Sequence, residues 1–305
     1  MRATEKRICL TNDMARAAAL IRAGELVAFP TETVYGLGAN ALDDAAIDKI
    51  YVAKGRPASS PLIVHVSSAE MARSLVREWP EQAEQLTRIF WPGPLTLVLP
   101  KEPHVPDRAT AGLDTVGVRM PANPIALELI LQAGVPIAAP SANRFTELSP
   151  TTAQHVRDSL GDRVAMVLDG GPSNVGIEST VLSIIDADAV LLRPGMITRQ
   201  QIEEVIGPVQ IGEPVAEGSH ASPGLHHRHY SPKTPLILVQ PGCLPSGGRG
   251  IRLQMPADPR AYAAVLYERL HEADVQAWDW IAIEKPPPGD EWSAIRDRLE
   301  RAAAR

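Results

Sequence analysis

A break in composition at residues 207–235 divides this chain. Proline, glycine and small residues dominate the segment, which shows no hydrophobic periodicity and is typical of a linker. Strand-like and helix-like patterns alternate before it and resume after it. A chain of 305 residues is long enough for two domains of roughly 100–200 residues each. The sequence therefore predicts a large domain over 1–210, a linker over 211–235 and a small domain over 236–305.

The large domain is predicted to be α/β, with one large, twisted, mixed sheet and flanking helices, because its elements do not follow a regular βαβ repeat. Its expected strands are 26–29, 62–66, 95–99, 115–120, 136–139, 164–169, 179–184 and 189–193. Its expected helices are 14–23, 43–54, 69–77, 81–90, 123–133, 152–160 and 199–206. The small domain is expected to be α/β as well, with strands 236–239 and 280–283 and helices 259–272 and 291–303.

Composition excludes several classes of protein. The chain is 45% hydrophobic and 22% charged, which excludes wholesale disorder. No apolar run approaches the ~18 residues of a membrane span, and the N-terminus lacks the apolar region of a secretory signal. Two distant cysteines, Cys9 and Cys243, suggest neither a zinc site nor a disulfide framework. We therefore expect a soluble, cytoplasmic protein without membrane contact.

The charge balance argues against a general nucleic-acid binder. Acidic residues outnumber basic ones, 36 to 30, and only 4% of the residues are aromatic. Nucleic-acid binders usually show the opposite charge balance, and aromatic side chains supply base stacking. A local basic cleft stays possible, because a site needs only a few well-placed cations.

Common nucleotide and hydrolase motifs are missing, so the site has to be inferred from residue chemistry. The chain lacks GxxxxGK[ST], GxGxxG, HExxH and GxSxG. Hydroxyls and glycines of segment 29–41 follow a predicted strand, where they form either a tight turn or a ligand contact. Lys54 and Arg56 flank Gly55 at a helix end, where they either cap the helix dipole or bind phosphate.

Other polar residues also leave two interpretations open. His65 lies in an apolar strand and is more often structural. Arg119, also in a strand, needs an anionic partner if buried, either a fixed acid or a substrate carboxylate. Ser141 and Asn143 follow a strand end, and Ser149 begins a helix-start motif that could bind an anion or simply cap the helix. The remaining candidates are the GIEST segment at 176–180, Arg193, and a histidine cluster that favours loop contacts over metal: His226, His227 and His229.

Several short motifs occur in order along the chain. They are FPTETVYGLG (29–38), KGR (54–56), SAN (141–143), SPTT (149–152), GIESTV (176–181), LLRPG (191–195) and SPGLHHRHYSP (222–232). Together they closely resemble the two-domain L-threonylcarbamoyladenylate synthases, which join a YrdC-like catalytic domain to a small C-terminal domain. The resemblance is strong over 10–235 and looser over 259–303.

This resemblance implies a reaction of L-threonine, bicarbonate and ATP that yields threonylcarbamoyl-AMP and pyrophosphate. Other proteins would then transfer the threonylcarbamoyl group to an adenosine in tRNA; direct contact of this chain with tRNA is left open. On the threonine side it implies Thr33, His65, Arg119, Ser141 and Ser179, with Thr31 as the nearest competitor of Thr33. On the ATP side it implies Lys54, Arg56, Ser60, Thr115, Asn143, Ser149, Arg193 and Tyr230.

The implied mechanism needs no protein nucleophile, because positioning and charge stabilisation suffice. Lys54 and Arg56 would act electrostatically. Mg²⁺ is expected to arrive with ATP, without a carboxylate cage of the protein, and Glu178 is more plausible as a structural residue than as a metal ligand. Residues 222–232, including Tyr230, are expected to fold over the cavity as a lid.

Two departures from the family pattern stand out. Thr146 occupies a position where the family usually has glycine, which leaves the loop geometry and the placement of Ser149 open. A Gly/Pro-rich stretch at 239–251 replaces the first part of the C-terminal domain. The alternatives are an RNA-binding YrdC-like module without synthase activity, a carbamoyl transferase of hydrogenase maturation, which the two cysteines disfavour, and a weakly supported hydrolase using Ser141 with His65.

Overall fold

One large mixed sheet forms the centre of the computed structural model, which describes residues 13–185, 188–212 and 229–304. Its ten strands lie in the order β10-β9-β8-β4-β5-β3-β6-β2-β1-β7. They are β1 (Val27–Phe29), β2 (Gly36–Asn40), β3 (Ile63–His65), β4 (Leu95–Pro100), β5 (Thr115–Arg119), β6 (Ile137–Ala138), β7 (Met166–Val167), β8 (Thr180–Ile185), β9 (Asp188–Arg193) and β10 (Gln210–Ile211).

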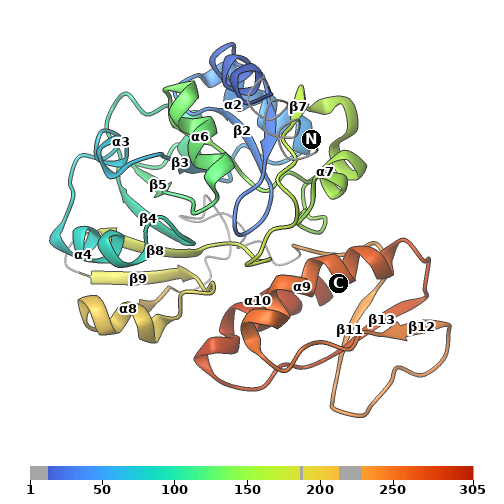
Figure 1. Cartoon of the computed structure of the whole chain (residues 1–305). Helices are drawn as coiled ribbons and strands as arrows, with labels where there is room; N and C mark the ends of the chain where they lie inside the picture. Colours follow the sequence, from blue (N-terminus) through green and yellow to red (C-terminus); the bar gives the residue numbers. More distant parts are fainter. Residues whose placement is uncertain (1–12, 186–187, 213–228, 305) are drawn as a thin grey trace, which may run out of the picture.

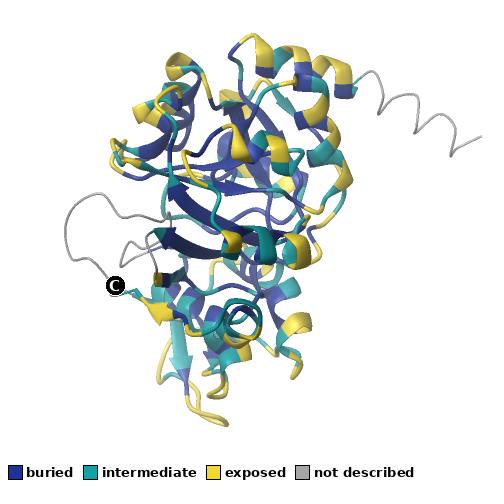
Figure 2. Ribbon diagram, turned by 90° about the vertical axis from the view of Figure 1, so that its left-hand side faces the viewer, coloured by how far each residue is buried: buried dark blue, intermediate teal, exposed yellow. Residues whose placement is uncertain are grey.

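Parallel and antiparallel pairs alternate irregularly in this sheet. The pairs β3/β5, β4/β8, β1/β7 and β9/β10 are parallel, whereas the five other pairs are antiparallel. The expected mixed, twisted sheet is therefore confirmed. Figure 2 shows most of its strands as buried, between helices whose outer surfaces are exposed, whereas the edge strand β10 is exposed.

Helices cover the sheet. Residues 13–22 are helical, and the other helices of this domain are α2 (Asp44–Lys54), α3 (Ala69–Arg73), α4 (Glu81–Phe90), α5 (Asp107–Thr110), α6 (Pro124–Ala133), α7 (Ala153–Leu160) and α8 (Arg199–Ile206). None of the described helices is both long and apolar enough to cross a bilayer.

The start and end of α2 determine where two of the expected cations lie. Asp43 caps the helix by accepting from the Ala45 and Ala46 amides, and Gly55 ends it in the left-handed conformation at φ 62°. The chain therefore turns sharply between Lys54 and Arg56, and both side chains become buried.

The small domain is a three-stranded parallel sheet with two helices. Its strands β11 (Leu236–Val239), β12 (Gly250–Arg252) and β13 (Trp280–Glu284) lie in the order β11-β13-β12. Helices α9 (Pro259–Asp274) and α10 (Ser293–Ala303) lie on the side of this sheet that faces the large domain (Figure 1). In the Gly/Pro-rich stretch after β11, the structure forms the short strand β12.

The core of the small domain continues into the large one. A single apolar cluster joins Leu266, Ile281 and Ile295 of the small domain to Ile177 and Leu148 of the large domain. The two domains therefore share a buried core, and the small domain obtains part of its apolar burial from its neighbour.

Two stacked histidines, one from each domain, make the stability of the protein depend on pH. The rings of His155 on α7 and His271 on α9 lie 3.9 Å apart at 21°. Burial and the neighbouring His271 lower the pKa of His155 to about 4, and burial lowers the pKa of His271. Asp158 and Asp274 oppose these shifts without cancelling them. Both rings are therefore neutral near pH 7.

Because the unfolded chain, with a histidine pKa of about 6.5, binds more protons, we expect stability to fall as the pH decreases from about 6.5 towards 4. Urea unfolding at several pH values measures this slope. His155→Gln should flatten it, and an unchanged slope in that variant would show that other groups cause it.

Candidate active site

A small, partly open cavity lies where strands β2, β3 and β5 meet the GIEST segment and residues 229–230. Its volume of about 50 Å³ is well below the ~300–1,000 Å³ of pockets that enclose small molecules. It must therefore widen to admit substrates. Eight of the residues assigned from the sequence to the threonine side or the ATP side line it: Thr33, Arg56, His65, Arg119, Ser141, Ser179, Arg193 and Tyr230.

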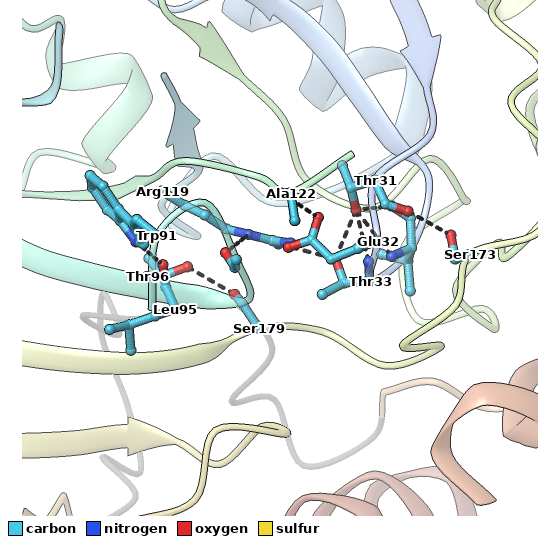
Figure 3. Close-up of polar contacts among 12 residues, drawn as sticks. Thr31, Glu32, Thr33, Trp91, Leu95, Thr96, Arg119, Ala122, Ser173 and Ser179 are labelled. Atoms are coloured by element: carbon cyan, nitrogen blue, oxygen red, sulfur yellow. Dashed lines mark hydrogen bonds and ion pairs between the residues drawn. The ribbon is translucent and has the colours of Figure 1, made fainter. Parts of the chain in front are cut away.

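Arg119 already has an acidic partner. Its Nη2 donates to Glu32 Oε1 at 2.6 Å, its Nη1 to Thr33 Oγ1 at 3.0 Å and its Nε to the Gly93 carbonyl at 3.3 Å (Figure 3). Glu32 also accepts from the Ala122 amide. Of the two partners that the sequence left open for Arg119, the structure shows the fixed acid, Glu32. Arg119 joins the end of β5 to the turn after β1.

The two candidate threonines have different surroundings. Thr31 Oγ1 donates to the Val34 carbonyl at 2.6 Å and accepts from the amides of Thr33 and Val34, so it stabilises its own turn. Thr33 Oγ1 is bonded to Arg119 and lies 2.8 Å from Thr31 Oγ1. Both line the cavity, and Thr33 is the one that contacts the arginine.

His65 is a neutral, buried ring in the cavity wall. Burial and the neighbouring Arg119 lower the pKa of His65 to about 3. Its Nδ1 is enclosed without a hydrogen-bond partner among the described residues. A neutral imidazole with an unused ring nitrogen can hydrogen-bond to a ligand and places no positive charge beside a substrate ammonium.

Two cations, Arg56 and Arg193, line the other side of the cavity, and Lys54 contacts the backbone of Ser141, which also lines it. Lys54 Nζ donates to the carbonyls of Ser141 and Asn143 at 2.6 and 2.5 Å, and burial holds the pKa of Lys54 well below its usual value. Burial lowers the pKa of Arg56 to about 10, and burial lowers the pKa of Arg193 as well. The Arg56 Nε lacks a hydrogen-bond partner in the described part of the chain.

Four predicted ATP-side residues occupy other positions. Asn143 holds its own loop by donating to the carbonyls of Arg144 and Glu147. The Ser60 carbonyl accepts from the Tyr51 hydroxyl. Thr115 lines a separate, smaller cavity. Ser149 Oγ donates to Glu178 Oε1 at 2.5 Å, so Ser149 adjoins the main cavity through that carboxylate.

Glu178 is the centre of a hydrogen-bond network that sequence analysis did not foresee. Besides Ser149, the Tyr267 hydroxyl donates to Glu178 Oε2 at 3.1 Å and Arg298 Nε donates to the same oxygen at 2.7 Å. Burial raises the pKa of Glu178, but the guanidinium groups of Arg298 and Arg193 outweigh it and hold the pKa below its usual value. Glu178 is therefore an ionised residue whose oxygens are occupied by protein donors, which fits the structural role expected from the sequence.

Of the buried polar atoms without a hydrogen-bond partner among the described residues, several belong to residues that line this cavity or, for Asn143, closely follow a lining residue. They include Arg56 Nε, His65 Nδ1, Asn143 Oδ1 and the Tyr230 hydroxyl. Leaving such an atom unsatisfied costs about 1–3 kcal/mol, and a bound ligand can supply the missing partner. All four residues were among the sequence candidates.

The loop that carries Thr146 keeps a glycine-like geometry. Thr146 has φ 70°, in the left-handed region where a non-glycine residue is strained. Its carbonyl accepts from the Ser231 amide. Thr146 therefore adopts a backbone conformation that glycine adopts more readily.

Of the expected lid, residues 229–232 are described. Tyr230 is fully buried, has φ 58° and lines the cavity with His229. Residues 213–228, with His226 and His227, lie outside the described residues. In the described part of the chain, no group of three His, Cys, Asp or Glu side chains could hold a metal ion.

Comparison with known families covers nearly the whole chain. Residues 19–195 match the Sua5–YciO–YrdC family, described as telomere recombination, and residues 197–304 match the C-terminal domain of threonylcarbamoyl-AMP synthase. The second match includes α8 and β10, although β10 pairs with β9 in the large sheet.

Two curated relatives illustrate the similarity. The threonylcarbamoyl-AMP synthase of Bacillus subtilis is 44% identical over 96% of this chain and 94% of its own. A putative threonylcarbamoyl-AMP synthase of Mycobacterium tuberculosis is 41% identical over 63% of this chain and 88% of its own.

The structure agrees with these relationships. The crystal structure of Pyrococcus abyssi Sua5 complexed with L-threonine superimposes with a TM-score of 0.88 at 41% identity, covering 95% of this chain and 94% of that chain. This chain therefore belongs to the two-domain threonylcarbamoyl-AMP synthases of the Sua5–YrdC family.

Proposed function

We propose that the cavity condenses L-threonine, bicarbonate and ATP into threonylcarbamoyl-AMP and pyrophosphate. The observation that carries this proposal is the set of unsatisfied buried polar atoms, on Arg56, His65, Asn143 and Tyr230, gathered at and around one cavity. The solved relative with L-threonine supports the amino-acid substrate. An RNA-binding module has no comparable support, because a backbone binder needs accessible cations, whereas Lys54, Arg56 and Arg193 are buried.

Threonine is proposed to bind beside Thr33, His65, Arg119, Ser141 and Ser179. The neutral His65 ring offers its Nδ1 to the substrate, and the Thr33 and Ser179 hydroxyls offer further polar contacts. Arg119 keeps its bond to Glu32 and adds positive potential towards the substrate carboxylate through its remaining N–H groups. Glu32 thereby orients the guanidinium and moderates its charge.

ATP is proposed to occupy the side with Arg56, Arg193, Lys54 and Tyr230. Arg56 and Arg193 are forked donors suited to phosphate oxygens. Ser60, Asn143 and Ser149 support the surrounding loops, and Thr115 would need a shift of β5 to contact the nucleotide. The cavity is proposed to open by movement of Tyr230, one of the residues that line it.

The reaction itself requires no covalent protein intermediate. The neutral amine nitrogen of threonine bonds to the carbon of bicarbonate with loss of water, which yields N-carboxythreonine. A carboxylate oxygen of this adduct then attacks the α-phosphorus of ATP. The bond between that phosphorus and the bridging oxygen breaks, and pyrophosphate leaves. The buried cations stabilise charge on the phosphates, and enclosure protects the labile carbamate from water.

Mg²⁺ is best treated as part of the nucleotide substrate. Glu178 is the acid that lines the cavity, and its oxygens accept from Ser149, Tyr267 and Arg298. These residues do not fit a protein cage for the ion, so the phosphate oxygens would hold it. Proteins that transfer the threonylcarbamoyl group to tRNA are the proposed downstream partners, and the cytoplasm, which holds both ATP and tRNA, is the proposed location.

We expect pyrophosphate release from ATP only when threonine and bicarbonate are both present. Omitting either should reduce release to the level without enzyme, because the attacking carboxylate forms only from the two together. A coupled pyrophosphate assay measures this, with mass spectrometry to detect threonylcarbamoyl-AMP. Release that is independent of threonine and bicarbonate would refute the proposed reaction.

A further inference from the structure

A buried arginine of the small domain contacts two residues that line the cavity, Glu178 and Tyr230. Arg298 lies on α10, and its side chain is 0% exposed. Its Nε donates to Glu178 Oε2 at 2.7 Å and its Nη2 to the Pro194 carbonyl at 3.0 Å. Its guanidinium carbon lies 5.3 Å from the centre of the Tyr230 ring. One side chain therefore contacts the GIEST segment, the residue after Arg193, and the linker.

These contacts counteract a repulsion between two negative groups in the cavity. Glu178 lines the wall, and the proposed substrate carries a triphosphate. Two like charges in a water-poor cavity repel strongly. Arg298 compensates the carboxylate from behind, while Asp297 accepts from Arg298 Nη1 at 2.5 Å and limits the excess positive charge.

Tyr267 adds a second contact from the same domain. It lies on α9, its hydroxyl donates to the Glu178 carboxylate, and its ring lies 5.9 Å from that of Tyr230. The small domain thus supports both Glu178 and Tyr230. The burial of both side chains depends on the docked domain.

We propose that Arg298 is a positioning residue for ATP: it neutralises Glu178 and supports Tyr230, and so makes docking of the small domain a condition for nucleotide binding. This inference rests on the proposed function for the identity of the nucleotide. Arg298 acts through other residues and does not itself line the cavity. A purely structural ion pair is the competing explanation, because a buried pair can be close to neutral in net stability and still be costly to break.

The first test replaces Arg298 by methionine and measures equilibrium binding of ATP and of threonine by calorimetry. Since the substitution leaves the Glu178 charge unpaired beside the triphosphate, we expect ATP affinity to fall by about 30-fold or more. Threonine affinity should change by less than about threefold, because the threonine side is assigned to the Arg119 end of the cavity. Arg296→Met is the matched control on the same helix, since Arg296 donates to the carbonyls of Pro287 and Gly289 within its own domain.

The second test adds Glu178→Gln to Arg298→Met. A neutral amide removes the unpaired charge, so we expect the double variant to recover at least about tenfold in ATP affinity over Arg298→Met. If Arg298→Met does not fold, Tyr267→Phe deletes one donor to the same carboxylate and should weaken ATP binding without affecting threonine.

Each outcome either supports or overturns the proposed role of Arg298. Selective loss of ATP affinity with recovery in the double variant supports the proposal. Unchanged ATP affinity in a folded Arg298→Met protein overturns it. So does equal loss of both ligands without recovery, or, where Arg298→Met does not fold, unchanged ATP affinity in Tyr267→Phe. If the wild-type protein releases pyrophosphate without threonine or bicarbonate, the proposed reaction fails, whereas the ATP-binding comparison still tests Arg298.

Discussion

Replacing Arg119 by methionine is expected to lower the free energy of unfolding by about 3–5 kcal/mol. The arginine and Glu32 side chains are only 4% and 7% exposed, so removing one partner leaves the other as an uncompensated charge in a site of low polarity. In this variant, the Ala122 amide is the one hydrogen-bond donor that the described residues still offer to the Glu32 carboxylate. Urea unfolding at pH 7 measures the loss.

The double variant Glu32→Gln/Arg119→Met is the control for this prediction. It removes both charges, and we expect it to be more stable than Arg119→Met alone, since the unpaired carboxylate is gone. Its threonine affinity should remain poor. If Arg119→Met unfolds at the same urea concentration as the wild type, the Arg119–Glu32 pair stabilises the protein no more than an exposed ion pair does. The role proposed for this buried pair in the cavity is then wrong.

Replacing Arg56 by methionine is expected to reduce kcat/KM for ATP by about 30-fold to 1,000-fold, because a buried, charge-assisted contact to phosphate is lost. Stability should change little, since the Arg56 side chain makes one hydrogen bond among the described residues, to the Pro61 carbonyl. Methionine retains much of the apolar volume of the stem. Steady-state pyrophosphate release at saturating threonine measures the effect.

Arg56→Lys separates charge from geometry at this position. Lysine keeps a positive charge but lacks the planar fork, so we expect an intermediate kcat/KM. The KM for threonine should stay near the wild-type value in both variants. An unaltered KM for ATP in Arg56→Met would contradict the placement of the triphosphate beside this arginine.

Local signals predicted most of the elements correctly. Asp43 and Gly55 mark the ends of α2 as helix caps should. The strand β2 was missed because its sequence, GLGAN, lacks β-branched and aromatic residues. It forms because Gly38 allows close packing: a Cβ there would lie 2.7 Å from the Phe29 ring. This reason depends on tertiary packing, which a local sequence pattern does not show.

The sequence predicted which residues belong to the candidate site, but not which of them pair with one another. Motifs identified the residues that line the cavity, yet they could not show that Glu32 neutralises Arg119, a contact between residues 87 positions apart. Arg298 lies further away in sequence, 120 positions from Glu178. One signal was present: Arg298 falls on the apolar face of α10, with Ile295 and Ala302, where an arginine needs a buried partner.

The core shared between the two domains has a consequence for shorter proteins of this type. A chain that stopped after the large sheet would present Ile177, Leu148 and Val34 to water, since all three belong to the cluster completed by α9 and α10. Such a patch favours aggregation. We expect single-domain proteins of this type to carry polar side chains or an additional covering segment at these positions. Removing the small domain from this chain would expose an aggregation-prone apolar surface, which would obscure any effect on catalysis.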